Sequence, residues 1–253
     1  MVLFLHNTSK VEGEPYPNLL KEKGGRGFPT LVFMDATGEV LHQQAWTKRS
    51  VAAFHKSHRA LDTLARLAGK AEQGDESVKK AIFFAKLELD RYGFKEAKAE
   101  MENLSFSDEQ KTSLQIALVE LEFNEASKSA GADRKALTKK FLEMYKAGRI
   151  PQGRHSARTF CSTLLNHAQA EKDVKLYEEA LPKYKVAVHK SSIAWRSSSV
   201  PDKPLPKYKA ADYKRAFRYE DAVLEALKAG KEPPDRQTFK GTGGGRGARV
   251  IRR

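Results

Sequence analysis

Short apolar runs and glycine-containing turns alternate over the first 69 residues of the chain. Short apolar runs bounded by turn residues are typical of strands, whereas apolar residues spaced three and four apart are typical of helices. The pattern predicts, in order, a strand, a short helix, a two-stranded hairpin and a longer helix, over residues 2–8, 17–25, 30–46 and 51–69. Thr47 and Ser50 are both candidate caps for the longer helix, and Gly69 marks its end.

From residue 75 onward the pattern changes to one helix after another. Six apolar stripes recur at helical spacing, over residues 81–92, 97–104, 114–121, 137–144, 160–164 and 176–184. Asp133 is the expected cap of the fourth helix, and Pro182 is expected to kink or end the sixth. We therefore expect tandem helix pairs over residues 75–189.

The remainder of the chain divides into three parts. Residues 190–207 have no period and are rich in serine and proline, which predicts a linker. Residues 208–230 predict a last helix with Tyr213, Phe217 and Leu224 on one side. Residues 231–253 predict a disordered basic tail, because they cannot bury enough surface to offset their chain entropy.

The charge balance extends this picture to partners. The 253 residues carry a formal net charge of +14, and Lys183 to Arg218 alone holds ten Lys/Arg against two Asp. A positive field of this kind attracts polyanions such as RNA, and the candidate contacts are Arg246, Arg249, Arg252 and Arg253 in the tail. The alternative is that the charge serves solubility, because a basic balance by itself reads no nucleic-acid sequence.

Cysteine and histidine usage bounds the chemistry. Cys161 is the only cysteine, which excludes an intrachain disulfide, a two-cysteine redox cycle and a cysteine-rich zinc site. Because Cys161 falls within a helical stripe, we expect it to be a buried apolar residue. The seven histidines show no tight ligand spacing. We predict no catalytic residues, no metal and no cofactor within this chain.

Residues 25–41, GRGFPTLVFMDATGEVL, resemble the C-terminal half of a thioredoxin-like domain. That family has a glycine, an apolar residue, a cis-proline and a threonine ahead of its last two strands. The resemblance implies a cis bond before Pro29 and a peptide-binding edge formed by Phe28, Pro29 and Thr30. The family's dithiol motif is absent, so no pair of thiols here can attack a disulfide and resolve the intermediate.

The resemblance also implies that a central strand of the family's sheet is missing, because the match begins with the strand at residues 2–8. Neighbouring strands would then expose unpaired backbone groups. The remaining strands could close on each other, a second chain could supply the strand, or the polypeptide could be an incomplete copy of a longer protein. We favour the incomplete copy, because Met1 falls directly before a strand.

Residues 87–104 resemble a tetratricopeptide repeat, a pair of helices with small residues where they cross. The matching positions are Leu87, Gly93, Phe94, Ala97 and Leu104. The other helix pairs fit this pattern poorly, and an irregular helical bundle is the alternative.

Together these features predict a mostly α-helical chain. An α+β partial thioredoxin-like unit over residues 1–69 would precede an all-α, tetratricopeptide-like region. The leading functional hypothesis is a non-catalytic protein that binds a protein or an extended peptide. The alternatives are the substrate-side part of a thiol-disulfide oxidoreductase with an upstream Cys-x-x-Cys, and RNA or polyanion binding through the basic C-terminal region. No membrane partner is expected; the oligomeric state and the compartment are not predicted, beyond cytoplasmic as the chain stands and exported if an upstream segment exists.

Overall fold

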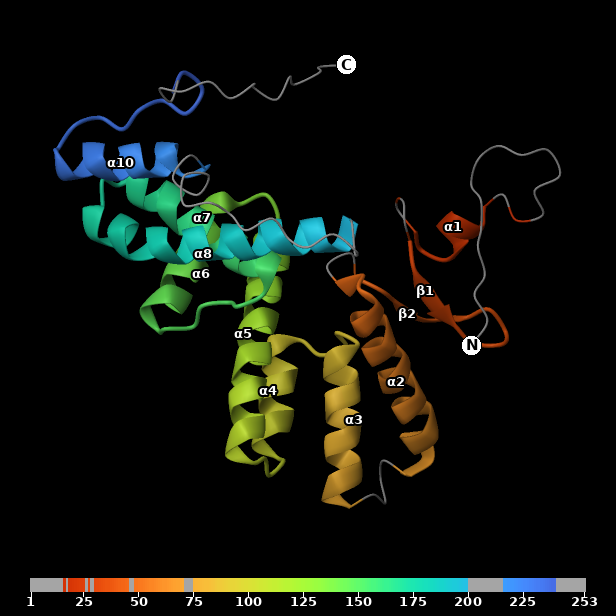
Figure 1. Ribbon diagram of the computed structural model, residues 1–253. Helices are drawn as coiled ribbons and strands as arrows, with labels where there is room; N and C mark the ends of the chain where they lie inside the picture. The colour runs from red at the N-terminus through yellow and green to blue at the C-terminus, as the bar shows by residue number, and fades with distance from the viewer. Residues whose placement is uncertain are drawn as a thin grey trace. The chain divides into compact units, whose positions relative to one another are not determined.

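The computed structural model describes residues 16, 18–25, 27, 30–45, 48–70, 75–199 and 216–239 (Figure 1). The chain divides into two compact units, residues 1–107 and 108–253, which are described separately below. The described residues are mostly helical, and their strands form one two-stranded sheet. The prediction of a mostly α-helical chain is therefore confirmed. The thioredoxin-like and tetratricopeptide-like assignments and the predicted domain boundaries remain predictions.

The first unit contains the predicted hairpin. A one-turn helix, α1 (Leu19–Glu22), precedes strand β1 (Val32–Met34), which pairs antiparallel with β2 (Val40–Gln43). The turn between the strands closes on Asp35, whose carboxylate accepts hydrogen bonds from the Thr37 hydroxyl at 2.6 Å and the Glu39 amide at 3.0 Å. Gly38 provides the positive φ of +85° that this turn requires. The predicted strand over residues 2–8 lies outside the described residues.

Helix α2 (Val51–Leu67) follows the hairpin and packs against it. Of the two predicted caps, Ser50 caps the helix, because its hydroxyl accepts a hydrogen bond from the Ala53 amide at 3.2 Å. Thr47 lies outside the described part of the chain. The ring of Phe33 on β1 stacks on Phe54 of α2, with 4.6 Å between the ring centroids. The helix ends in a 3-10 turn over Ala68–Lys70, which agrees with the predicted stop near Gly69.

Two further helices belong to the first unit, α3 (Glu76–Glu88) and α4 (Phe94–Glu102). Asp75 caps α3 by accepting a hydrogen bond from the Val78 amide at 3.0 Å. Helix α3 packs along α2, where Ala60, Ala85 and Leu89 are buried together. The second unit therefore begins after α4, whereas the sequence pattern had grouped α3 and α4 with the later helices.

The second unit is entirely helical in its described part: α5 (Asp108–Ala130), α6 (Arg134–Lys146), α7 (Arg154–Ala170), α8 (Val174–Ser199) and α10 (Arg218–Lys228). Asp133 caps α6 as predicted, since its carboxylate accepts hydrogen bonds from the Lys135 and Ala136 amides. The centre of the core is fully buried and is formed by Phe141, Met144, Phe160, Leu164, Tyr177 and Ala180. Helices α7 and α8 pack along each other, and α10 covers α8.

Helix α8 corrects two expectations. It does not end at Pro182, and Figure 1 draws it as one continuous helix. Residues 190–199, predicted as the start of a linker, are its last turns. Burial of Ala180, Leu181 and Tyr184 around the proline offsets the lost backbone hydrogen bond. Beyond it no proline or glycine interrupts the helix before Pro201, and serine costs a helix little. Residues 200–207 lie outside the described residues.

The segment after α10 also differs from its prediction as a disordered tail. Residues 231–239 fold back on α10, where the guanidinium of Arg236 lies 5.0 Å from the centre of the Tyr219 ring. Arg236 also forms an ion pair with Glu220 at 3.2 Å, and Phe239 packs edge-on against Tyr219. These contacts join groups 16 to 20 residues apart, so local composition could not reveal them. The rest of the predicted tail, residues 240–253, is not described.

Candidate functional site

The entrance to β1 is the first candidate site, because the sequence places the peptide-binding residues there. The Thr30 hydroxyl donates a hydrogen bond to the Gly27 carbonyl at 2.6 Å, which closes a tight turn immediately before the strand. Phe28 and Pro29 lie between these two residues and outside the described part of the chain. The predicted cis bond thus remains a prediction, while the turn and half-buried Thr30 are observed.

The outer edge of β1 follows directly from the pairing of the hairpin. The Gln44 amide donates to the Leu31 carbonyl at 2.9 Å, so these two residues form a hydrogen-bonded pair. In an antiparallel ladder the next residue directs its N–H and C=O to the opposite side. Val32 therefore presents its backbone groups away from β2, and β1 has no other strand partner among the described residues.

Exposed apolar side chains lie beside this edge. Leu31 is 36% exposed, and Val40 and Leu41 on β2 are 38% and 42% exposed. The register shifts between Phe33 and Met34, which is the signature of a β-bulge. Large apolar side chains gathered around a strand edge are typical of surfaces that another chain covers.

The opposite edge of the hairpin is held by the end of α3. Lys48, which follows β2, donates to the Glu88 carbonyl at 3.0 Å and forms an ion pair with Asp90 at 3.0 Å. Arg91 donates to the Leu41 carbonyl at 3.0 Å. Asp90 itself has a positive φ of 54°, which an aspartate tolerates better than most residues. These bonds fix the hairpin on the β2 side.

Several polar groups are buried between the hairpin and α2. The atoms His42 Nε2, Gln44 Oε1 and Ser57 Oγ have no hydrogen-bond partner within the described residues. Burial lowers the pKa of half-buried His42, since desolvation disfavours its charged form. The Asp90 carboxylate opposes this shift, whereas the charges of Lys48 and Arg91 add to it.

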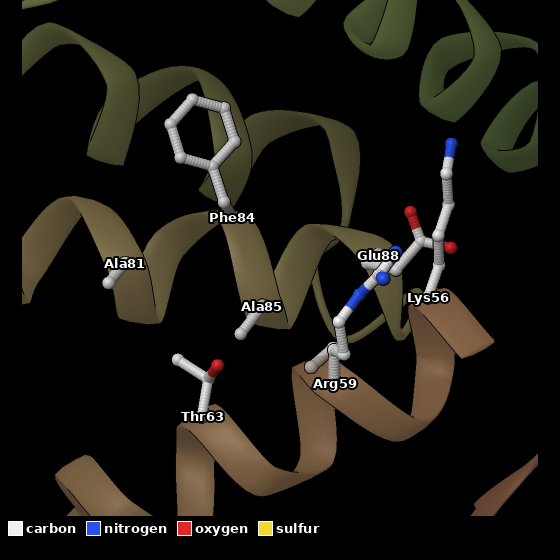
Figure 2. A pocket seen from close by; sticks show the side chains of 8 residues that line it. Lys56, Arg59, Thr63, Ala81, Phe84, Ala85 and Glu88 are labelled. Atoms are coloured by element: carbon white, nitrogen blue, oxygen red, sulfur yellow. The ribbon is translucent and has the colours of Figure 1, made fainter.

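A shallow groove of about 310 Å³ lies between α2 and α3. Figure 2 shows Lys56, Arg59 and Glu88 gathered at one end, Phe84 at the other, and Ala85 on the floor between them. None of its lining residues is a cysteine, a histidine or a serine, and Glu88 is its single carboxylate. The groove therefore has the chemistry of a binding surface and lacks a nucleophile paired with a base.

The thiol of Cys161 is buried within α7, as predicted, with 2% of the residue exposed. Burial raises its pKa to about 11, so the thiol stays protonated and is a poor nucleophile at neutral pH. The described residues contain no cluster of three or more His, Cys, Asp or Glu that could hold a metal. Among the helices of the same residues, none has the length and apolar composition needed to cross a membrane.

The other predicted site residues, Arg246, Arg249, Arg252 and Arg253, all fall in the part of the chain that the structure does not describe. Conversely, the bonds of Lys48 and Arg91 to the hairpin's surroundings were not predicted. They join residues 40 to 50 positions apart, and no local pattern signals such contacts.

Comparisons with known proteins add no relative. No protein-family model matches the sequence, no curated protein matches it, and no solved structure matches it. The functional argument therefore depends on the geometry described above.

Proposed function

We propose that this protein is a non-catalytic binding protein whose first unit accepts an extended protein segment along the outer edge of β1. The observation that carries the proposal is the direction of the Val32 N–H and C=O groups, which point away from β2. An incoming strand would pair with these groups by β-augmentation, in which main-chain hydrogen bonds provide affinity.

The side chains near the edge support the same proposal. Leu31, Val40 and Leu41 would lose exposed apolar area when covered, which favours binding by about 25 cal/mol for each Å² buried. Phe28, Pro29 and Thr30 would lie at the start of the added strand and help select its side chains. The helical second unit would serve as a scaffold for the same protein partner, as in helical-repeat proteins.

The protonated thiol of Cys161 supports a non-catalytic role, because it cannot act as the attacking thiolate of an exchange reaction. The groove between α2 and α3 likewise offers cations and an aromatic ring, without an acid–base pair.

The test begins with peptides selected from a random display library on the full chain, with affinity then measured by fluorescence anisotropy. Val32→Pro removes the N–H that faces the incoming strand and leaves the β1–β2 bonds intact. Gln43→Pro is the matched control, because the Gln43 N–H points to the outer edge of β2. We expect Val32→Pro to weaken binding at least tenfold and Gln43→Pro to leave it unchanged.

Val32→Thr keeps the amide and the shape of the side chain, and it should bind like the wild type. Circular dichroism must show that all three variants are folded. Equal affinity of Val32→Pro and Gln43→Pro for the selected peptides would remove the β1 edge from consideration.

A further inference from the structure

Three lysines form a line along the solvent-facing side of α6. Lys135, Lys139 and Lys146 are all exposed. With 3.6 residues per turn they lie within about 40° of one another around the helix, and a rise of about 1.5 Å per residue makes the line about 16 Å long. Phe141 and Met144 lie on the other side of α6, fully buried, so the core fixes the direction in which the lysines point. We call these three residues the α6 lysine stripe.

The stripe has no carboxylate partner within the described part of the second unit. Other lysines of this unit are neutralised by acids: Lys185 pairs with Asp221 at 2.5 Å, Lys228 with Glu178 at 2.6 Å and Lys140 with Glu122 at 3.6 Å. Residues 134–158 contain eight Lys/Arg, and Glu143 is their one acid. Because Glu143 pairs with Lys140 at 3.7 Å, the stripe keeps its full positive charge.

The surroundings of the stripe favour a phosphate backbone over a protein as its occupant. Protein interfaces depend on aromatic or apolar anchors. The exposed large apolar residues described in the second unit are Ile116 on α5 and Val186 on α8, and none is on α6. Phosphate oxygens, by contrast, are commonly bound by lysine alone.

The same surroundings favour a double strand over a single strand. Single-stranded nucleic acid is held largely by bases that stack on exposed aromatic rings. Tyr145, the aromatic residue of α6 outside the buried core, is already engaged: its hydroxyl donates to Glu179 at 3.1 Å, and the Lys183 ammonium lies 5.6 Å from its ring centre. A duplex presents phosphates and needs no such platform.

We propose that the α6 lysine stripe is a docking surface for the phosphate backbone of double-stranded nucleic acid, without sequence preference. The net charge of +14 steers such a polyanion toward the chain, and the stripe gives the contact a fixed position on a folded helix. This inference is independent of the β1 edge, which lies in the other unit.

The test measures binding of the full chain to a fluorescent 20-base-pair DNA duplex by anisotropy, from 50 to 200 mM NaCl. The variant K135Q/K139Q/K146Q removes three charges and keeps helix propensity. The control K79Q/K95Q/K98Q removes three exposed charges from α3 and α4, so the net charge is the same. Each phosphate contact contributes about −0.9 to the slope of log K against log salt.

We expect the stripe variant to lose about 2.7 of that slope, and the wild-type affinity to fall about 40-fold more steeply across this salt range. The control should retain the wild-type slope, and K135R/K139R/K146R should retain both slope and affinity. Equal losses in the two glutamine variants would overturn the proposal. Competition by polyglutamate as strong as by unlabelled duplex, or tighter binding of the matching single strand, would overturn it as well.

Discussion

The side chain of Arg149 forms two hydrogen bonds with the carboxylate of Glu122, from Nε at 2.8 Å and from Nη2 at 3.2 Å. Glu122 is only 4% exposed, and Lys140 lies 3.6 Å from the same carboxylate. The pair joins α5 to the segment after α6. A buried carboxylate is tolerated in the core of the second unit because this fork of donors satisfies it.

Arg149→Met should therefore destabilise the second unit by about 2 kcal/mol, less than the 3–5 kcal/mol typical of a fully buried pair, because Lys140 remains beside the carboxylate. Glu122→Leu combined with Arg149→Met should recover part of this loss, since no charge is then left buried without a partner. Urea denaturation followed by circular dichroism measures both, with the two units fitted as separate transitions. A double variant less stable than both single variants would contradict this account.

The stability of the first unit should fall as the pH is lowered from 7.5 to 5. Because the pKa of folded His42 is below its ordinary value of 6.5, the unfolded chain binds a proton more readily than the folded chain. The stabilisation is therefore complete above pH 6.5 and is lost as the pH falls toward the pKa of the folded state. His42→Phe should flatten this dependence in urea unfolding at pH 5, 6, 7 and 8. An unchanged slope in the variant would show that another group is responsible.

Gly148→Ala should destabilise the second unit by about 1–2 kcal/mol, the cost of a left-handed backbone for a residue with a Cβ. Gly148 ends α6 with a φ of +71°, and no atom lies within 4 Å of an added Cβ, so the effect is one of backbone conformation alone. Gly69→Ala is the control, because its surroundings are equally open and its φ is not positive. It should be neutral or stabilise by about 0.5–1 kcal/mol. Similar losses in both variants, measured by urea unfolding, would disprove the conformational explanation.

Cys161 should be inert in the folded chain. With a pKa raised to about 11 by burial, about one thiol in a thousand is ionised at pH 8. We expect reaction with Ellman's reagent to be slow until denaturant is added, and no acceleration of insulin reduction by dithiothreitol. Acceleration that persists in Cys161→Ser would mean that the chain promotes exchange by a route other than its thiol.

Local signals were sufficient to predict much of the fold. The hairpin was predicted from two β-rich runs around a glycine-containing turn, and Ser50 and Asp133 were identified as caps because a short polar side chain precedes each helical run. The continuation of α8 through Pro182 was missed because burial of its neighbours outweighs the backbone cost. Propensity alone contains no information on that burial.

The candidate site was predicted only in part. Phe28, Pro29 and Thr30 were placed correctly in sequence at the mouth of β1, and the hydrogen bond of Thr30 to Gly27 is the contact observed there. The free edge at Val32 depends on the pairing register, which a sequence pattern leaves open. The α6 lysine stripe was overlooked because attention to net charge favoured the C-terminal region, whereas the stripe depends on which lysines lack an acidic neighbour.

The packing of residues 231–239 on α10 has a practical consequence for dissecting this protein. A fragment ending at Gly230 would strip the cover from Tyr219 and leave the carboxylate of Glu220, 8% exposed, without the guanidinium that balances it. Truncation for structural or biochemical work should accordingly retain the chain through Phe239, and a shorter version would be expected to aggregate through the uncovered flank of its last helix.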